Sequence, residues 1–188
     1  MSDDIYIGPT VLAPGASDTG RRLAGRLLIP LSLLLFLVVL VFYVFFTAIT
    51  VRGESMEPTL LNGDRLLVTK SYKVPARGDI VVFKTLDRAN REEDLVKRVI
   101  AVPGDTVEVR QGIALVNGAV EQTRGIRTSP YDNTYVQPAV VPPGHVFVLG
   151  DNRPIALDSR GLGPVPSFSI KGKAVYVFAS PDRTRSLR

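Results

Sequence analysis

A serine and a lysine in this chain have surroundings that could make them reactive. Ser55 lies in the turn VRGESMEPTL, directly after a long apolar segment, and is either a turn residue or a nucleophile. A serine attacks a carbonyl group only when a neighbouring group takes its proton, and the common partner is histidine. The one histidine is His145 in PPGHVFVLG, where a surface or edge position at the start of a strand is the simpler interpretation.

A lysine can also activate a serine. A lysine with its ordinary pKa, near 10.4, is neutral in only about one molecule in 2,500 at pH 7. Lowering that pKa to about 7 costs roughly 4.6 kcal/mol, which burial among apolar residues can supply. Lys97 is the best candidate because it lies inside the apolar run DLVKRVIAV, whereas Lys70 and Lys84 end their runs. The alternative interpretation is a surface lysine beside Arg98.

A third polar stretch, GDNRPIALDSRGLGPVP, follows the apolar run VFVL. Asp158 and Arg160 can pair across a turn there, which on its own indicates a structural clamp. The chain has no cysteine, so disulfides, thiolate catalysis and cysteine-based zinc sites are excluded. With one histidine it also lacks any site that needs two. We therefore predict no metal ion and no organic cofactor.

An uncharged segment precedes Ser55. Residues 27–51 carry no charge, and their 25 residues are enough to cross a hydrocarbon core of about 30 Å. The segment is too long for a cleaved secretion signal and its TAIT end is a poor cleavage site, so we expect a retained anchor. The arginines before it predict a cytoplasmic N-terminus and a domain outside the membrane after residue 50. Residues 1–26 are predicted to be a disordered cytoplasmic tail.

Residues 52–182 are expected to form one extracytoplasmic domain of the mainly β class. Short β-branched runs, bounded by turn residues, predict a coiled antiparallel, barrel-like sheet. These runs are DRLLVTK, DIVVFK, LVKRVIAV, DTVEVR, IALVNG, HVFVLG and KAVYVFA. The charged residues 85–95 indicate an exposed hairpin loop, and the polar, proline-rich residues 121–144 a small β insertion or cap. A basic tail, residues 183–188, ends the chain.

The charge of the chain does not favour nucleic-acid binding. The formal net charge of +5 is modest and spread along the sequence. No basic stripe with stacking aromatic residues and no nucleic-acid-binding motif is visible. A solvated surface near anionic lipid headgroups is the preferred interpretation, so nucleic acid is not among the predicted partners.

Together these stretches resemble bacterial type I signal peptidases over residues 30–180. The motifs are GESMEPTL, GDIVVFK, LVKRVIAVPGDTV and GDNRPIALDSRGLGPVP, in the order of that family and directly after a membrane anchor. The resemblance implies a membrane-bound serine endopeptidase that removes signal peptides from translocated preproteins. It implies cleavage after small residues in an Ala-x-Ala pattern, and a β-sheet catalytic core with a smaller β subdomain.

The resemblance also implies roles for particular residues. Ser55 matches the nucleophile of the family and Lys97 its general base. Asp158 and Arg160 match a pair that braces the site, and Ser159 lies between them. The predicted partners are therefore preprotein signal peptides and the lipid bilayer.

Two positions depart from the pattern of the family. Gly53 stands where some members carry a hydroxyl that supports the oxyanion, which leaves that task to the backbone. Ala156 stands where the final motif usually has a serine that orients the lysine, so we expect reduced but real activity, with Ser159 or a water as substitute. The apolar neighbours of the two catalytic candidates are expected to line a shallow substrate pocket: Val51, Leu95 and Val96.

Ala156 also leaves other functions open. One is a weak or inactive membrane-anchored homologue that binds signal peptides or regulates a partner. Another is a specialised peptidase of the same fold that serves pili or conjugation. A self-cleaving Ser-Lys repressor would need a DNA-binding helical module in place of the anchor, and the sequence shows none.

Overall fold

The computed structural model describes residues 18–72, 74–87, 89–123, 125–129, 131–179 and 183–187. The chain divides into two compact units, with the boundary between Phe42 and Tyr43. The helix α1, Asp18–Phe45, provides the described part of the first unit. Its segment Leu28–Phe45 has a mean hydropathy of 2.9, and none of it is buried inside the protein. By length and composition this segment can cross a membrane.

The helix begins and ends earlier than the predicted anchor. Residues 18–26, expected in a disordered tail, are helical, in keeping with their leucine, alanine and arginine content. At its other end α1 stops at Phe45, although the predicted anchor continued to residue 51. Phe46–Thr50 instead forms strand β1, which pairs with β2 over five residues. Its β-branched residues favour a strand over a helix, and the pairing with β2 stabilises that conformation.

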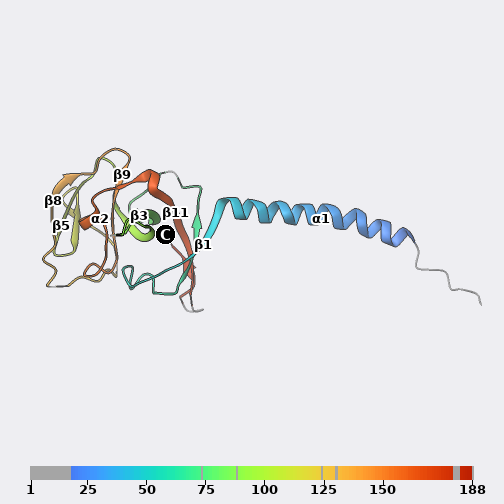
Figure 1. Cartoon of the computed structure of the whole chain (residues 1–188), viewed down its shortest axis with the longest axis horizontal. Helices are drawn as coiled ribbons and strands as arrows, with labels where there is room; N and C mark the ends of the chain where they lie inside the picture. The colour runs from blue at the N-terminus through green and yellow to red at the C-terminus, as the bar shows by residue number, and fades with distance from the viewer. Residues whose placement is uncertain are drawn as a thin grey trace, which may run out of the picture. The chain divides into compact units, whose positions relative to one another are not determined.

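The second unit is built from two antiparallel sheets (Figure 1). The larger has the order β1-β2-β11-β3-β4-β9-β10, with β12 paired to β11, and the smaller has the order β7-β6-β5-β8. The strand bounds are Phe46–Thr50 (β1), Arg65–Thr69 (β2), Ile80–Leu86 (β3), Glu92–Ala101 (β4), Thr106–Arg110 (β5), Ile113–Val116 (β6), Ala119–Val120 (β7), Tyr135–Val140 (β8), His145–Leu149 (β9), Val165–Pro166 (β10), Ile170–Phe178 (β11) and Arg185–Ser186 (β12). Two short helices, α2 (Ser159–Leu162) and the 3₁₀ helix η1 (Ser167–Ser169), lie between β9 and β11. The mainly β class predicted from the sequence is confirmed.

Apolar residues cover both faces of the larger sheet. Along β3, Ile80 and Val82 belong to one buried cluster, and Val81 and Phe83 belong to another. This alternation follows from the two-residue period of a strand. It explains why the central strands appear in the sequence as continuous apolar runs. Lys97 lies opposite Val81 in the neighbouring strand β4, so it enters a buried part of the sheet.

The predicted loop at residues 85–95 is mostly strand. Strand β3 continues to Leu86 and β4 begins at Glu92, which leaves a connection of five residues, 87–91. Lys84 and Glu92 form an ion pair of 2.6 Å between these two strands. The charged residues therefore extend a β hairpin, and the high polarity of the segment reflects its exposure.

The smaller sheet is larger than the predicted insertion. Of the described residues between 121 and 144, only those of strand β8 join it, paired with β5. The strands β5 and β6, predicted as part of the main sheet, and β7, which was not predicted, form the rest of it. Two tight turns, Gln111-Gly112 and Asn117-Gly118, connect these three strands, and all four turn residues have positive φ. Such turns close hairpins locally, so these strands pair with one another.

Candidate active site

Ser55 and Lys97 lie in direct contact. The Lys97 Nζ atom donates a hydrogen bond of 2.8 Å to Ser55 Oγ and a second, of 2.9 Å, to the carbonyl oxygen of Val96. Lys97 is only 2 % exposed, whereas Ser55 is partly exposed. The sequence alternative of a surface lysine is therefore wrong, and the two candidates are placed as a nucleophile and a base would be.

Burial lowers the pKa of Lys97 from 10.5 to about 8. The apolar surroundings disfavour the ammonium form, and three carboxylates oppose this effect, Asp158 first, then Glu93 and Asp151. A substantial fraction of Lys97 is therefore neutral at mildly alkaline pH. A neutral lysine can accept the proton of a neighbouring hydroxyl group.

The turn that carries Ser55 is fixed on both sides. The next residue, Met56, is buried in the core, and Leu60, also buried, donates its backbone N–H to the Met56 carbonyl. From a distant part of the chain, Asn152 donates its backbone N–H to the Ser55 carbonyl (3.0 Å) and its side-chain amide to the Glu54 carbonyl (3.1 Å). Among the described residues, the backbone N–H of Ser55 makes no such bond. It is therefore available to a ligand.

Gly150 allows the loop that contains Asn152 to lie close to the Ser55 backbone. A β carbon on Gly150 would lie 2.5 Å from the Ser55 carbonyl oxygen and 2.3 Å from the Ala156 β carbon. Both distances are far shorter than real contacts, so only glycine fits without a shift. The roles of Gly150 and Asn152, both in the GDNR motif, were not predicted from the sequence. Its glycine and its dense polar groups after a buried strand were the available signals.

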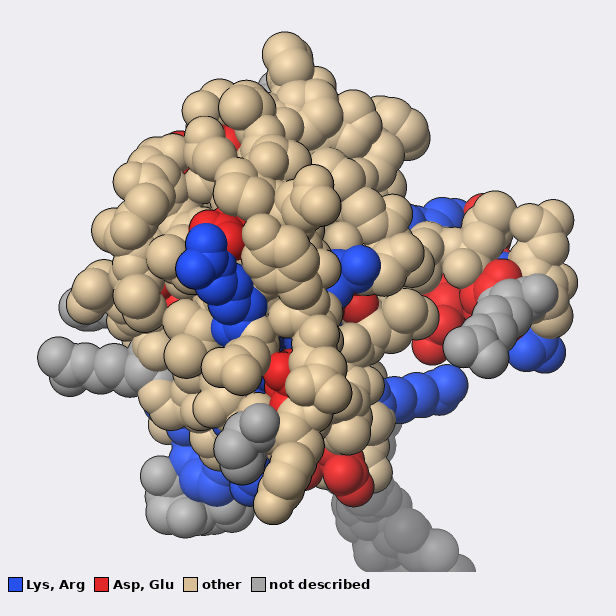
Figure 2. All heavy atoms as spheres, turned by 90° about the vertical axis from the view of Figure 1, so that its left-hand side faces the viewer, with Lys and Arg blue, Asp and Glu red and all other residues tan. Residues whose placement is uncertain are grey.

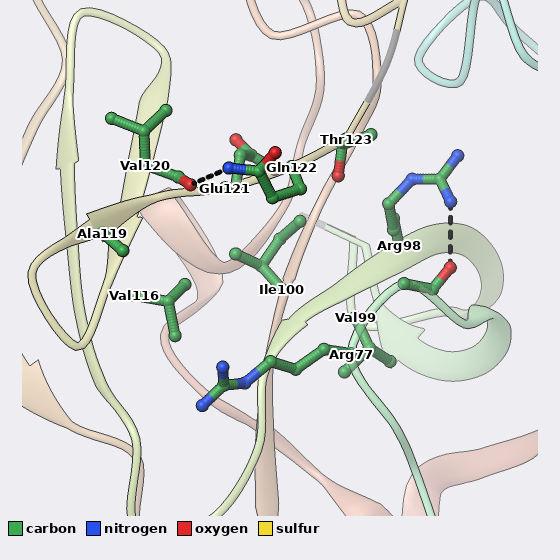
Figure 3. Close-up of a pocket in the computed structure, with 11 residues that line it drawn as sticks. Arg77, Arg98, Val99, Ile100, Val116, Ala119, Val120, Glu121, Gln122 and Thr123 are labelled. Carbon is green, nitrogen blue, oxygen red and sulfur yellow. Dashed lines mark hydrogen bonds between the residues drawn. The ribbon is translucent and has the colours of Figure 1, made fainter.

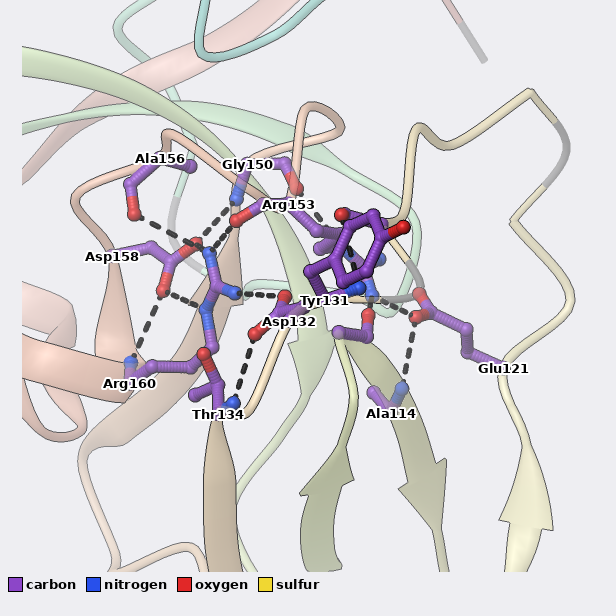
Figure 4. Close-up of polar contacts among 12 residues, drawn as sticks. Ala114, Glu121, Tyr131, Asp132, Thr134, Gly150, Arg153, Ala156, Asp158 and Arg160 are labelled. Atoms are coloured by element: carbon purple, nitrogen blue, oxygen red, sulfur yellow. Dashed lines mark hydrogen bonds and ion pairs between the residues drawn. The ribbon is translucent and has the colours of Figure 1, made fainter.

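Asp158 and Arg160 form the predicted ion pair (Figure 4). The Asp158 carboxylate accepts bonds of 2.9 Å from the Arg160 guanidinium and of 3.0 Å from the Gly150 backbone N–H. It also accepts the Arg160 backbone N–H and thereby caps α2. Arg160 donates in turn to the carbonyl oxygens of Arg153 and Ala156. The pair thus holds the loop that contacts the Ser55 backbone.

Ser159 and Gly53 have other contacts than those considered from the sequence. The Ser159 hydroxyl is buried and accepts the Val148 backbone N–H at 2.9 Å, so it serves β9. It makes no contact with Lys97 among the described hydrogen bonds. Val96 provides the second acceptor for Lys97, through its carbonyl. The Gly53 backbone N–H donates to the side chain of Asn62.

A cleft of about 580 Å³ contains both Ser55 and Lys97. The end of β1 lines one side of it, and residues 92–97 of β4 line another. All three predicted pocket residues contribute to its lining: Val51, Leu95 and Val96. Val51 is 3 % exposed and packs mainly in the core, whereas the other two are half-buried. The predicted pocket residues therefore lie beside the candidate pair.

A second cleft, of about 480 Å³, lies beside β4 and β7 and has neither Ser55 nor Lys97 in its lining (Figure 3). Its two arginines already bind carboxylates, Arg77 that of Asp105 and Arg98 that of Asp151. Within the part of the chain that the structure describes, no group of three or more His, Asp or Glu could hold a metal ion. Figure 2 shows basic and acidic side chains interspersed with uncharged residues on one face of the molecule.

A buried lysine beside a serine is a pair that a serine hydrolase can use, and the apolar helix α1 is long enough to cross a membrane. The profile of the family described as "Signal peptidase, peptidase S26" matches residues 25–179. The chain therefore belongs to the peptidase S26 family of signal peptidases, and it is a hydrolase.

Individual proteins are similar to this chain to different extents. The chain is 36 % identical over 151 residues to "Signal peptidase IB" of Staphylococcus aureus, which covers 70 % of this chain and 77 % of that protein. It is 36 % identical over 146 residues to "Thylakoidal processing peptidase 1, chloroplastic" of Arabidopsis thaliana, covering 71 % of this chain and 42 % of that protein. The crystal structure of a signal peptidase I from Enterococcus faecalis matches with 33 % identity and a TM-score of 0.44, over 55 % of this chain and 98 % of that one.

Proposed function

We propose that this protein removes signal peptides from preproteins with Ser55 as nucleophile and Lys97 as general base. The observation that supports these roles most directly is the 2.8 Å hydrogen bond between the two side chains. The low exposure of Lys97 and its lowered pKa are what a lysine base requires.

The proposed reaction proceeds through an acyl-enzyme. Ser55 Oγ attacks the carbonyl carbon of the scissile peptide bond while neutral Lys97 takes the hydroxyl proton. The negative oxygen of the tetrahedral intermediate accepts the Ser55 backbone N–H, which is free of other bonds among the described residues. Lys97 then gives its proton to the leaving amine as the C–N bond breaks. A water molecule, deprotonated by the same lysine, hydrolyses the ester and releases the signal peptide.

The preprotein is proposed to bind as an extended strand between β1 and β4. In the described part of the chain, β1 is an edge strand with β2 as its one neighbouring strand, and residues 92–97 of β4 have β3 as theirs. Four antiparallel steps separate β1 from β4, so both strands run in the same direction, toward Ser55 and Lys97. A peptide between them can hydrogen-bond with either edge. The side chains of Leu95 and Val96 would limit the room beside it and favour small residues before the cut.

Membrane anchoring would bring the enzyme and its substrate together. The proposed orientation has Arg21, Arg22 and Arg26 on the cytoplasmic side and the catalytic unit outside. The strand β1 follows α1 without a linker, so the cleft begins close in sequence to the end of the apolar helix. A signal peptide also spans the bilayer, and its cleavage site follows its apolar segment. Confinement to one layer would raise the frequency of productive encounters.

The second candidate, a homologue that binds signal peptides with little cleavage, is favoured only by Ala156. The contacts of Lys97 with Ser55 and with the Val96 carbonyl argue against it, because they hold the lysine without a hydroxyl at position 156.

The test is cleavage of a preprotein with an Ala-x-Ala exit by the full-length protein in detergent. Ser55→Ala and Lys97→Ala are the matched variants, and N-terminal sequencing of the product locates the cut. We expect the wild type alone to cut, after the second alanine. Binding without cleavage by all three proteins would support the second candidate.

A further inference from the structure

Glu93 is an acidic side chain in the catalytic cleft with no ion pair among the described contacts. It is exposed and belongs to the lining of the cleft that contains Ser55. The acidic residues on either side of it in the sequence are already paired. Glu92 binds Lys84 and Asp94 binds Lys171, both at 2.6 Å. Of the three neighbouring carboxylates Glu92, Glu93 and Asp94, that of Glu93 is therefore the one available to a ligand.

Glu93 lies on the same face of β4 as Lys97. Side chains alternate along a strand, so residues 93, 95 and 97 share one face, and residues 92, 94 and 96 the other. The negative charge of Glu93 helps to hold the ammonium form of Lys97, which agrees with this placement. Four residues of strand separate the two positions by about 13 Å. Arg52, the basic residue that precedes the Ser55 turn, lines the cleft on the β1 side.

We propose that Glu93 makes this enzyme prefer preproteins with a lysine or arginine at the fifth position before the cleavage site. The proposal rests on the function given above, with the substrate extended along β4 toward Ser55. The residue whose carbonyl group meets Ser55 lies at the level of Lys97. In a parallel extended strand, the residue four positions earlier lies at the level of Glu93, and it is the fifth before the cut.

The register also predicts where the preference is absent. A side chain at the sixth position before the cut points to the opposite side of the substrate strand from the fifth. A basic residue there lies farther from the Glu93 carboxylate. Because the ion pair is exposed to solvent, its effect is modest and weakens with salt.

The experiment compares kcat/KM for preproteins that differ only in having Lys, Gln or Glu at the fifth position, at low ionic strength. The wild type should cut the Lys substrate about two- to fivefold faster than the Gln substrate, with the Glu substrate slowest. Glu93→Gln should remove the difference, and Glu93→Lys should reverse it. The matched control Asp94→Asn/Lys171→Gln removes a neighbouring ion pair of the same cleft, leaves the charge of Glu93 and should keep the preference. Moving the substrate lysine from the fifth to the sixth position before the cut should reduce the wild-type preference.

Three results would overturn the proposal: equal rates in the wild type, a preference that survives Glu93→Gln, or an equal loss of preference in Asp94→Asn/Lys171→Gln. In each of these cases cleavage itself persists and the proposed function stands. If the wild type cuts none of the substrates, the proposed function fails, and this preference fails with it.

Discussion

Replacement of Gly150 by alanine should lower kcat/KM about 10²-fold although Gly150 makes no contact with substrate in the proposed mechanism. The new β carbon would lie 2.3 Å from the Ala156 β carbon and 2.5 Å from the Ser55 carbonyl oxygen. Ordinary contacts begin at 3.4 Å, so the two segments must separate by about 1 Å. A displacement of that size at a nucleophile costs about 10²-fold in rate. Overpacking of this kind also costs about 1–3 kcal/mol of stability.

The assay is kcat/KM with an Ala-x-Ala preprotein, together with thermal unfolding to show that the variant is folded. Gly161→Ala is the matched control, because a β carbon there meets only Leu157 Cδ1, at 3.9 Å. Gly161 belongs to the short helix α2, close in sequence to the Asp158 cap. The control should keep activity close to that of the wild type. A folded Gly150→Ala protein with unchanged kcat/KM would refute the argument that this glycine positions Ser55.

Three other changes test the environment of the pair. Lys97→Met should stabilise the fold at pH 7 by up to about 3 kcal/mol in urea unfolding, because burial holds the Lys97 pKa at about 8, below its unfolded value of 10.5. Between the folded pKa of about 8 and the unfolded pKa of 10.5, the unfolded chain binds more protons than the folded one. Wild-type stability should therefore rise as pH increases from 8 to 10.5, and the stabilisation by Lys97→Met should decrease over the same range. A stabilisation that does not change with pH would contradict an origin in the Lys97 pKa. Ala156→Ser should raise kcat with little change in KM if the added hydroxyl orients Lys97, and an unchanged kcat would count against that role. Asp158→Ala leaves Arg160 buried without its main partner and should cost about 3–5 kcal/mol of unfolding free energy; a loss below about 1 kcal/mol would show that the clamp is dispensable.

The strands of the larger sheet could be predicted because their side chains are buried on both faces. The run IVVF within DIVVFK is then apolar throughout, and its β-branched residues fit β3. The end of the apolar helix at Phe45 could not be predicted from the apolar pattern. Phe46–Thr50 is uncharged like the helix before it, and pairing with β2 fixes it as a strand. That pairing depends on residues outside the segment.

The candidate pair could be predicted because a buried lysine next to a serine leaves a local pattern in the sequence. Lys97 lies in an apolar run, and Ser55 lies in a small turn after an apolar helix. The support around them is non-local. Asn152 reaches the Ser55 backbone from nearly 100 positions away, and the Ser159 hydroxyl accepts the Val148 N–H of β9 instead of contacting Lys97. Such contacts follow from the path of the chain, which no local pattern encodes.

The most direct test of the Ser55–Lys97 mechanism is the pH dependence of acylation. A rapid-quench experiment with an activated ester of an Ala-x-Ala peptide, followed by peptide mapping, would locate the acyl group and give its rate of formation. The mechanism predicts an adduct on Ser55 whose rate rises with pH to a midpoint of about 8, the pKa of Lys97. In Lys97→Ala the adduct should form far more slowly and without that midpoint. An adduct on another residue, or the same pH profile in Lys97→Ala, would contradict the account.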